Sequence, residues 1–148
     1  MIRTISLLCA ILMMGALMGC KNTDSSGQDK TVTAADLMHH RYELVTFNNE
    51  AVPVAGDVAI EIAFGENMHV SGKACNRFNG NSSIENGVLK APHLASTRMF
   101  CAEEKVNQLE TALFGMLSTG AKVTIDGDKL ILRDGDNRII YTRRDLMQ

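Results

Sequence analysis

The stretch that decides the fold runs from residue 123 to residue 142 and reads VTIDGDKLILRDGDNRIIYT. Three runs rich in aliphatic and β-branched residues lie at 123–125, 130–132 and 138–142, and each is separated from the next by an Asp-Gly pair. Asp-Gly between apolar runs is a strong signal for a tight turn between antiparallel strands. The stretch therefore predicts a three-stranded meander.

The same period of two governs the middle of the chain. From Val58 to Phe64 every second side chain is large and apolar, and residues 68–72 follow after Gly-Glu-Asn, so the pattern predicts a hairpin with one buried face. The Asn86-Gly87 pair predicts another tight turn. Shorter strands are expected at residues 42–47, 82–84 and 88–90.

One long stretch breaks this period and predicts a helix from about residue 103 to 117. Its apolar residues recur three or four positions apart, and Gly120 favours an end to the helix. The apolar stripe consists of Val106, Leu109, Leu113 and Met116 or Leu117. A capping box at Thr33–Asp36 predicts a shorter helical turn at 34–38. The expected fold class is α+β, a curled antiparallel sheet or partly open barrel with one main amphipathic helix.

The N-terminus predicts export. Arg3 precedes an apolar run at 5–17 that is too short to span a bilayer, which is typical of a signal peptide. Leu17-Met18-Gly19-Cys20 resembles a bacterial lipobox, so we expect a signal peptide at 1–19 and a lipid on Cys20; an ordinary cleavable signal that contains a cysteine is the alternative. Lys21 directly after this cysteine favours the outer membrane as the location of the mature protein. We expect the protein to be lipid-anchored there on the periplasmic face.

The remainder divides into a tether and one domain. Residues 20–32 are polar and predict a flexible, lipid-anchored tether, while 33–148 has the length of one domain with one core, expected to be a monomer. Removing residues 1–19 changes the formal charge from −2 to −3, and the basic residues are scattered. Nucleic acid is therefore not an expected partner.

Two cysteines remain in the predicted domain, Cys75 and Cys101. In an exported protein two such thiols predict one disulfide, worth roughly 3 to 4 kcal/mol on the chain-entropy model. Around them, Phe78 and Met99 are expected to be core neighbours of the bridge, and Gly80 to lie in a turn.

Four polar residues of the same motifs have two possible roles. Asn76 and Thr97 are expected to bond to backbone groups where a strand ends. Arg77 and Arg98 would be brought close by the bridge and could bind a carboxylate or phosphate. The alternative is that each arginine pairs with a local Glu or stacks on an aromatic side chain such as Phe78.

These motifs resemble the META domain. The resemblance lies in residues 71–80, in residues 94–101, in Leu109-Glu110 and in the closing meander, and it covers about residues 33–146. It departs at Ala74, where many members have glycine, and at Phe100, where many have a small residue. The resemblance implies an envelope protein tied to heat response and novobiocin tolerance, with no established enzymatic activity.

Catalytic and metal motifs are absent from the sequence. It contains no Cys-x-x-Cys, Gly-x-Ser-x-Gly, phosphate loop or His-Glu-x-x-His, and neither Asp-Gly turn continues as a calcium loop. His39 and His40 are adjacent and would point to opposite faces of a strand. We therefore expect no enzyme, no metal and no cofactor.

Three classes of function follow from the sequence together with the META resemblance, which alone implies the role in stress response. The first is a non-enzymatic stress-response lipoprotein that binds an envelope protein or a small anionic or apolar ligand. The second is a pilotin-like secretion chaperone with a lipid or apolar peptide in the barrel mouth, which requires a cavity lined by residues such as Ile60, Ile62 and Val70. A periplasmic hydrolase or redox enzyme is third and requires a free thiol of low pKa.

Overall fold

The computed structural model describes residues 30–56 and 58–145. The predicted signal peptide, Cys20 and most of the predicted tether lie outside the described residues. The elements in chain order are α1 (Ala34–Leu37), β1 (His40–Phe47), β2 (Glu61–Phe64), the 3₁₀ turn η1 (Glu66–Met68), β3 (His69–Lys73), β4 (Arg77–Asn81), β5 (Ser83–Glu85), β6 (Val88–Lys90), β7 (Ala95–Ser96), α2 (Glu104–Thr119), β8 (Ala121–Asp126), β9 (Lys129–Arg133) and β10 (Arg138–Arg143).

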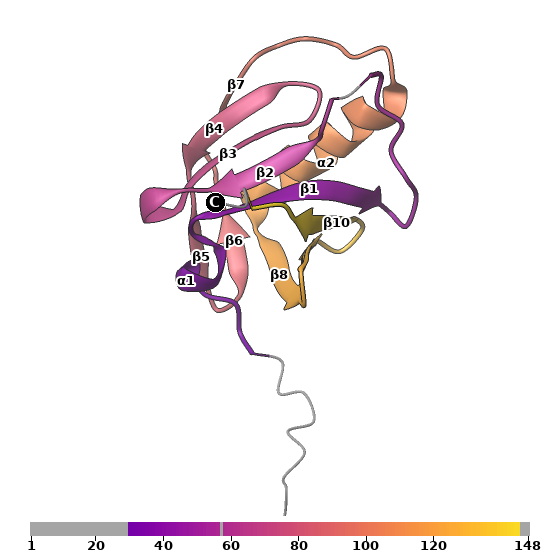
Figure 1. The fold of residues 1–148 in the computed structure, drawn as a ribbon. Helices are drawn as coiled ribbons and strands as arrows, with labels where there is room; N and C mark the ends of the chain where they lie inside the picture. The colour runs from indigo at the N-terminus through magenta and orange to yellow at the C-terminus, as the bar shows by residue number, and fades with distance from the viewer. Residues whose placement is uncertain (1–29, 57, 146–148) are drawn as a thin grey trace, which may run out of the picture.

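The strands form one antiparallel sheet in the order β5-β6-β8-β9-β10-β1-β2-β3-β4-β7. Figure 1 shows this sheet curling around α2, so that sheet and helix make a half-barrel. The predicted curled antiparallel sheet with one main helix is confirmed in this form. No helix within the described ranges is both long enough and apolar enough to cross a membrane.

The meander forms as the Asp-Gly pairs predict, because β8, β9 and β10 are neighbours in the sheet. In the first turn Gly127 adopts a φ of 58°, which glycine tolerates without strain. In the second turn the Asp134 carboxylate accepts hydrogen bonds from the N–H groups of Asp136 (3.0 Å) and Asn137 (2.7 Å). Both turns are therefore fixed by local chemistry.

The long helix is also confirmed, with bounds shifted by one residue at its start and two at its end. Its apolar stripe is buried inside the half-barrel, in one core cluster with residues from both halves of the sheet. At its C-terminus Gly120 has a φ of 128° and donates its N–H to the Met116 carbonyl (2.7 Å). The buried stripe consists of Val106, Leu109, Leu113, Met116 and Leu117.

Two local predictions are wrong. The first hairpin strand begins at Glu61, not at residue 58, and Val58 is exposed beside a surface pocket. Gly80 lies in strand β4, not in a turn. A Cβ at this position would come within 2.8 Å of the His93 carbonyl oxygen, so only glycine allows the main chain at His93 to pass this close to the strand. Sequence reasoning missed β4 because asparagine and glycine, which favour turns, fill it.

Candidate functional site

The two cysteine motifs meet at one corner of the sheet, around the buried side chain of Asn76. This residue is 4% exposed. Its Oδ1 accepts hydrogen bonds from the Met99 N–H (2.6 Å) and the Thr97 hydroxyl (2.9 Å). Its Nδ2 donates to the Met99 carbonyl (3.0 Å) and to Glu110 Oε1 (2.7 Å). An amide side chain has two donors and two acceptor sites, so Asn76 is fully satisfied.

Glu110 on α2 completes this network. Its second oxygen, Oε2, accepts the main-chain N–H of Asn76 at 2.6 Å. Sequence reasoning did not assign Glu110 a role. The available signal was its position: it lies four residues after Val106 and three before Leu113, so it is a charged residue at the border of the apolar stripe. A charge in that position indicates a polar partner on the facing sheet.

A disulfide joins Cys75 to Cys101, whose Cα atoms lie 5.7 Å apart, a typical separation for a bridged pair. Asn107 of α2 also holds Cys101 in place. Its side chain accepts a hydrogen bond from the Cys101 N–H (3.1 Å) and donates one to the Cys101 carbonyl (2.8 Å). The segment 97–101 is therefore held by Asn76 at one end and by the bridge and Asn107 at the other.

Met99 and Phe100 project from this held segment into solvent. Met99 is 63% exposed and Phe100 is 87% exposed. The expectation that Met99 is a core neighbour of the bridge is wrong, because both of its main-chain polar groups bond to Asn76 and its side chain is left outside. Phe78 is buried and packs edge-on against Phe114, with ring centroids 5.3 Å apart.

Arg77 and Arg98 lie close together along the backbone. The Thr97 N–H donates to the Arg77 carbonyl (3.1 Å), and the Arg77 N–H donates to the Thr97 hydroxyl (3.2 Å). Both arginine side chains are exposed, and within residues 30–56 and 58–145 neither forms an ion pair. Anion binding by this pair stays a prediction.

An apolar pocket of 260 Å³ lies beside the disulfide. Apolar side chains form most of its wall, and its two charged lining residues are Lys73 and Glu103. The pocket is lined by Val54, Ala55, Val58, Ile60, Lys73, Ala74, Cys75, Met99, Cys101, Ala102, Glu103 and Val106. The surface around the disulfide is therefore hydrophobic, which favours contact with an apolar group of a ligand.

The residues expected to line an internal cavity instead belong to the packed core. Ile60, Ile62 and Val70 are all buried in the cluster that includes the apolar stripe of α2. Ile60 alone of these three also lines the surface pocket. In the part of the chain that the structure describes, no three His, Cys, Asp or Glu residues gather in a way that could hold a metal ion.

Comparisons with known proteins show the family of this chain. A sequence model of the META domain matches residues 35–145. The chain is 39% identical over 140 residues to the heat shock protein HslJ of Escherichia coli (strain K12), covering 93% of this chain and 96% of that protein.

Two structures determined by NMR share the fold. One is 39% identical in sequence, has a TM-score of 0.72, and covers 79% of this chain and 99% of its own. The other, a protein from Burkholderia xenovorans, is 23% identical, has a TM-score of 0.61 and covers 76% of this chain and 87% of its own.

Proposed function

This chain belongs to the META domain family, and from that premise we propose that it is a non-enzymatic stress-response protein of the bacterial envelope that binds exposed apolar segments of other envelope polypeptides. The name of its Escherichia coli relative supports the link to heat. The apolar pocket beside the disulfide, whose lining includes the exposed side chain of Met99, is the observation that carries the binding role.

The size and position of the pocket favour a polypeptide as its occupant. At 260 Å³ it is smaller than the roughly 300–1,000 Å³ typical of small-molecule sites, so it suits one or two apolar side chains. Strand β7 is the last in the sheet order and its residues are exposed, so an extended segment can add to that edge by main-chain hydrogen bonds. We propose that side chains of such a segment reach the pocket, because Met99 of the pocket lining follows the end of β7 by three residues.

The packed interior argues against the pilotin-like alternative. A chaperone that holds a lipid in the barrel mouth needs an internal cavity, whereas Leu109, Leu113 and Leu117 of α2 fill the inside of the half-barrel. Surface binding needs no such cavity.

The location of the protein is part of the proposal. A lipid on Cys20 would anchor the domain to the outer membrane on the periplasmic face, where heat exposes apolar segments of misfolded envelope proteins. An export route also supplies the oxidising compartment in which the Cys75–Cys101 bridge is stable. Mass spectrometry of the purified chain tests both modifications directly.

The binding role is tested with a fluorescein-labelled decapeptide that alternates leucine and threonine, titrated against the purified protein by fluorescence anisotropy. Val54→Lys and Met99→Lys place a charge at the pocket on exposed positions and are expected to weaken binding at least tenfold. Val45→Lys is the matched control, since Val45 is 43% exposed and Val54 is 40% exposed. Equal binding by all variants, or none by the parent protein, would overturn the proposed function.

A further inference from the structure

Three cations stand in one row across neighbouring strands of the meander. The register places Lys122 of β8 opposite Arg133 of β9, and Arg133 opposite Arg138 of β10. Residues directly opposite in antiparallel strands share a face of the sheet, with Cβ atoms about 4.5–5.5 Å apart. Like charges in such positions repel each other, so the row costs stability when nothing neutralises it.

Protein carboxylates do not neutralise this row. Among the described residues, no Asp or Glu oxygen lies within ion-pair distance of Lys122, Arg133 or Arg138. On the same face Glu85 is two strands from Lys122, beyond Val88, and Asp126 is opposite Lys129 at the other end of β9. The charge of the row is therefore available to a ligand.

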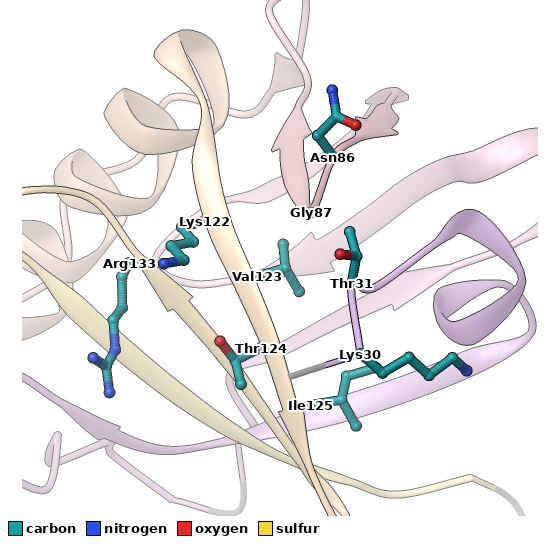
Figure 2. Close-up of a pocket in the computed structure, with 9 residues that line it drawn as sticks. All are labelled: Lys30, Thr31, Asn86, Gly87, Lys122, Val123, Thr124, Ile125 and Arg133. Carbon is teal, nitrogen blue, oxygen red and sulfur yellow. The ribbon is translucent and has the colours of Figure 1, made fainter. Parts of the chain in front are cut away.

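The row also borders a pocket of 580 Å³. Figure 2 shows Lys122, Thr124 and Arg133 on one side of strand β8, with the Thr124 hydroxyl on the side of the two cations. On the other side of β8 lie Val123 and Ile125, next to Lys30 and Thr31 at the start of the domain. The pocket thus wraps around the edge of β8.

Among the described strands, none pairs with this edge of β8 beyond the end of β6. Strand β6 pairs with β8 only at Ala121 and Lys122, and the Val123 N–H donates to the Gly87 carbonyl at 2.8 Å. Because hydrogen-bonding directions alternate along a strand, the N–H of Ile125 points to the same side as that of Val123, beyond the end of β6. The pocket therefore presents the cations Lys122 and Arg133 and the hydroxyl of Thr124.

We propose that Lys122, Thr124 and Arg133, with Arg138 adding its charge, form a binding site for a phosphate group. Phosphate has several oxygens and carries negative charge, and the arginine fork binds two of them at once while lysine acts as a point charge. Arg138 contributes charge and not a direct contact, since its Nη1 donates to Asn49 Oδ1 at 3.1 Å and its Nε is buried.

The source of the phosphate follows from the anchor, and this step depends on the proposed lipid at Cys20. Lys30 lines the pocket and is ten residues after Cys20, a distance of at most about 35 Å in a fully extended chain. The pocket is thus the part of the domain where the chain from the membrane enters. Phosphates of anionic lipid headgroups are the expected ligand, and free phosphate has the same chemistry.

The experiment records amide chemical shifts of the isotope-labelled protein, purified with its own lipid. In one arm, inorganic phosphate is titrated in neutral detergent at constant ionic strength, with chloride as reference. In the other arm, the protein is placed in nanodiscs of phosphatidylcholine with or without phosphatidylglycerol. Arg133→Gln is compared with Lys129→Gln, which removes the same charge from the same face of β9.

We expect shifts at residues 122–125 and 133, with the dissociation constant raised at least tenfold by Arg133→Gln and less than twofold by Lys129→Gln. Shifts in the phosphatidylglycerol arm assign the headgroup as ligand, and shifts with inorganic phosphate alone assign a soluble phosphate. No specific shift in either arm, or equal effects of both variants, overturns the site. The lipid on Cys20 is read separately from the mass spectrum, so failure of the anchor and failure of the anion site are distinguishable.

Discussion

Replacing Glu110 with alanine tests whether the buried network holds the candidate site in place. The Glu110 carboxylate accepts two hydrogen bonds from Asn76, one from its main-chain N–H (2.6 Å) and one from Nδ2 (2.7 Å). Asn76 is buried, so water does not readily replace the lost partner. A net contribution of about 1.5–3 kcal/mol per hydrogen bond to a charged group predicts a loss of about 3 kcal/mol, at the lower end because Glu110 itself is half-buried.

The measurement is urea denaturation of the oxidised protein, followed by circular dichroism, in a double-mutant cycle with Asn76→Ala. If the two residues act through each other, the coupling free energy should be about 2 kcal/mol, within the range seen for residues in contact. Glu104→Gln, on the exposed side of the same helix, is the charge-matched control and should change the free energy of unfolding by less than about 1 kcal/mol. Additive effects, or a loss below about 1 kcal/mol for Glu110→Ala, would refute the reasoning.

Three further predictions concern the frame of the domain. Reducing the Cys75–Cys101 bridge, whose cysteines are 26 positions apart, should lower the free energy of unfolding by about 3.5 kcal/mol on the chain-entropy model, measured by urea denaturation with and without reductant. Gly72→Ala should destabilise by about 3 kcal/mol in the same assay, because a Cβ there overlaps a neighbouring carbonyl oxygen and an aromatic ring. Hydrogen bonds from Lys30 and Thr33 hold the pKa of Asp36 at about 2, below its ordinary value. The stability that ionised Asp36 contributes is therefore present above about pH 4 and is lost as the pH falls towards 2. Between these pH values, the unfolding temperature of Asp36→Asn should decline less than that of the parent protein.

The parts of the fold that the sequence predicts well are those determined by neighbours in the chain. An Asp-Gly or Asn-Gly pair sets its own turn, and Asn86 and Gly87 indeed have φ values of 51° and 74°. The apolar stripe of α2 needs no knowledge of its partner to be recognised. The pairing within each hairpin follows once its turn is fixed, whereas the pairings of β1 with β10, β6 with β8 and β4 with β7 join segments that no such turn connects.

The parts that the sequence predicts poorly depend on contacts between distant segments. From the sequence, Gly80 is expected in a turn. In the structure it lies in strand β4, where the main chain at His93 passes close beside it. From the sequence, Met99 is expected in the core. In the structure both of its main-chain polar groups form hydrogen bonds with Asn76, and its side chain is exposed. The cationic row was not predicted, because recognising it requires the register of two successive turns, which places Lys122 opposite Arg133 and Arg133 opposite Arg138.

The structure also separates the residues that build the candidate site from those that would contact a ligand. The residues on which the family resemblance depends, such as Asn76, Phe78 and Cys75, are buried and act on the backbone or the core. Met99 and Phe100 instead expose their side chains to solvent. Membership of the family therefore predicts the frame and leaves the ligand open: under the proposed function, changes at these two exposed positions would alter what is bound, while the bridge and the Asn76 network would keep the segment in place.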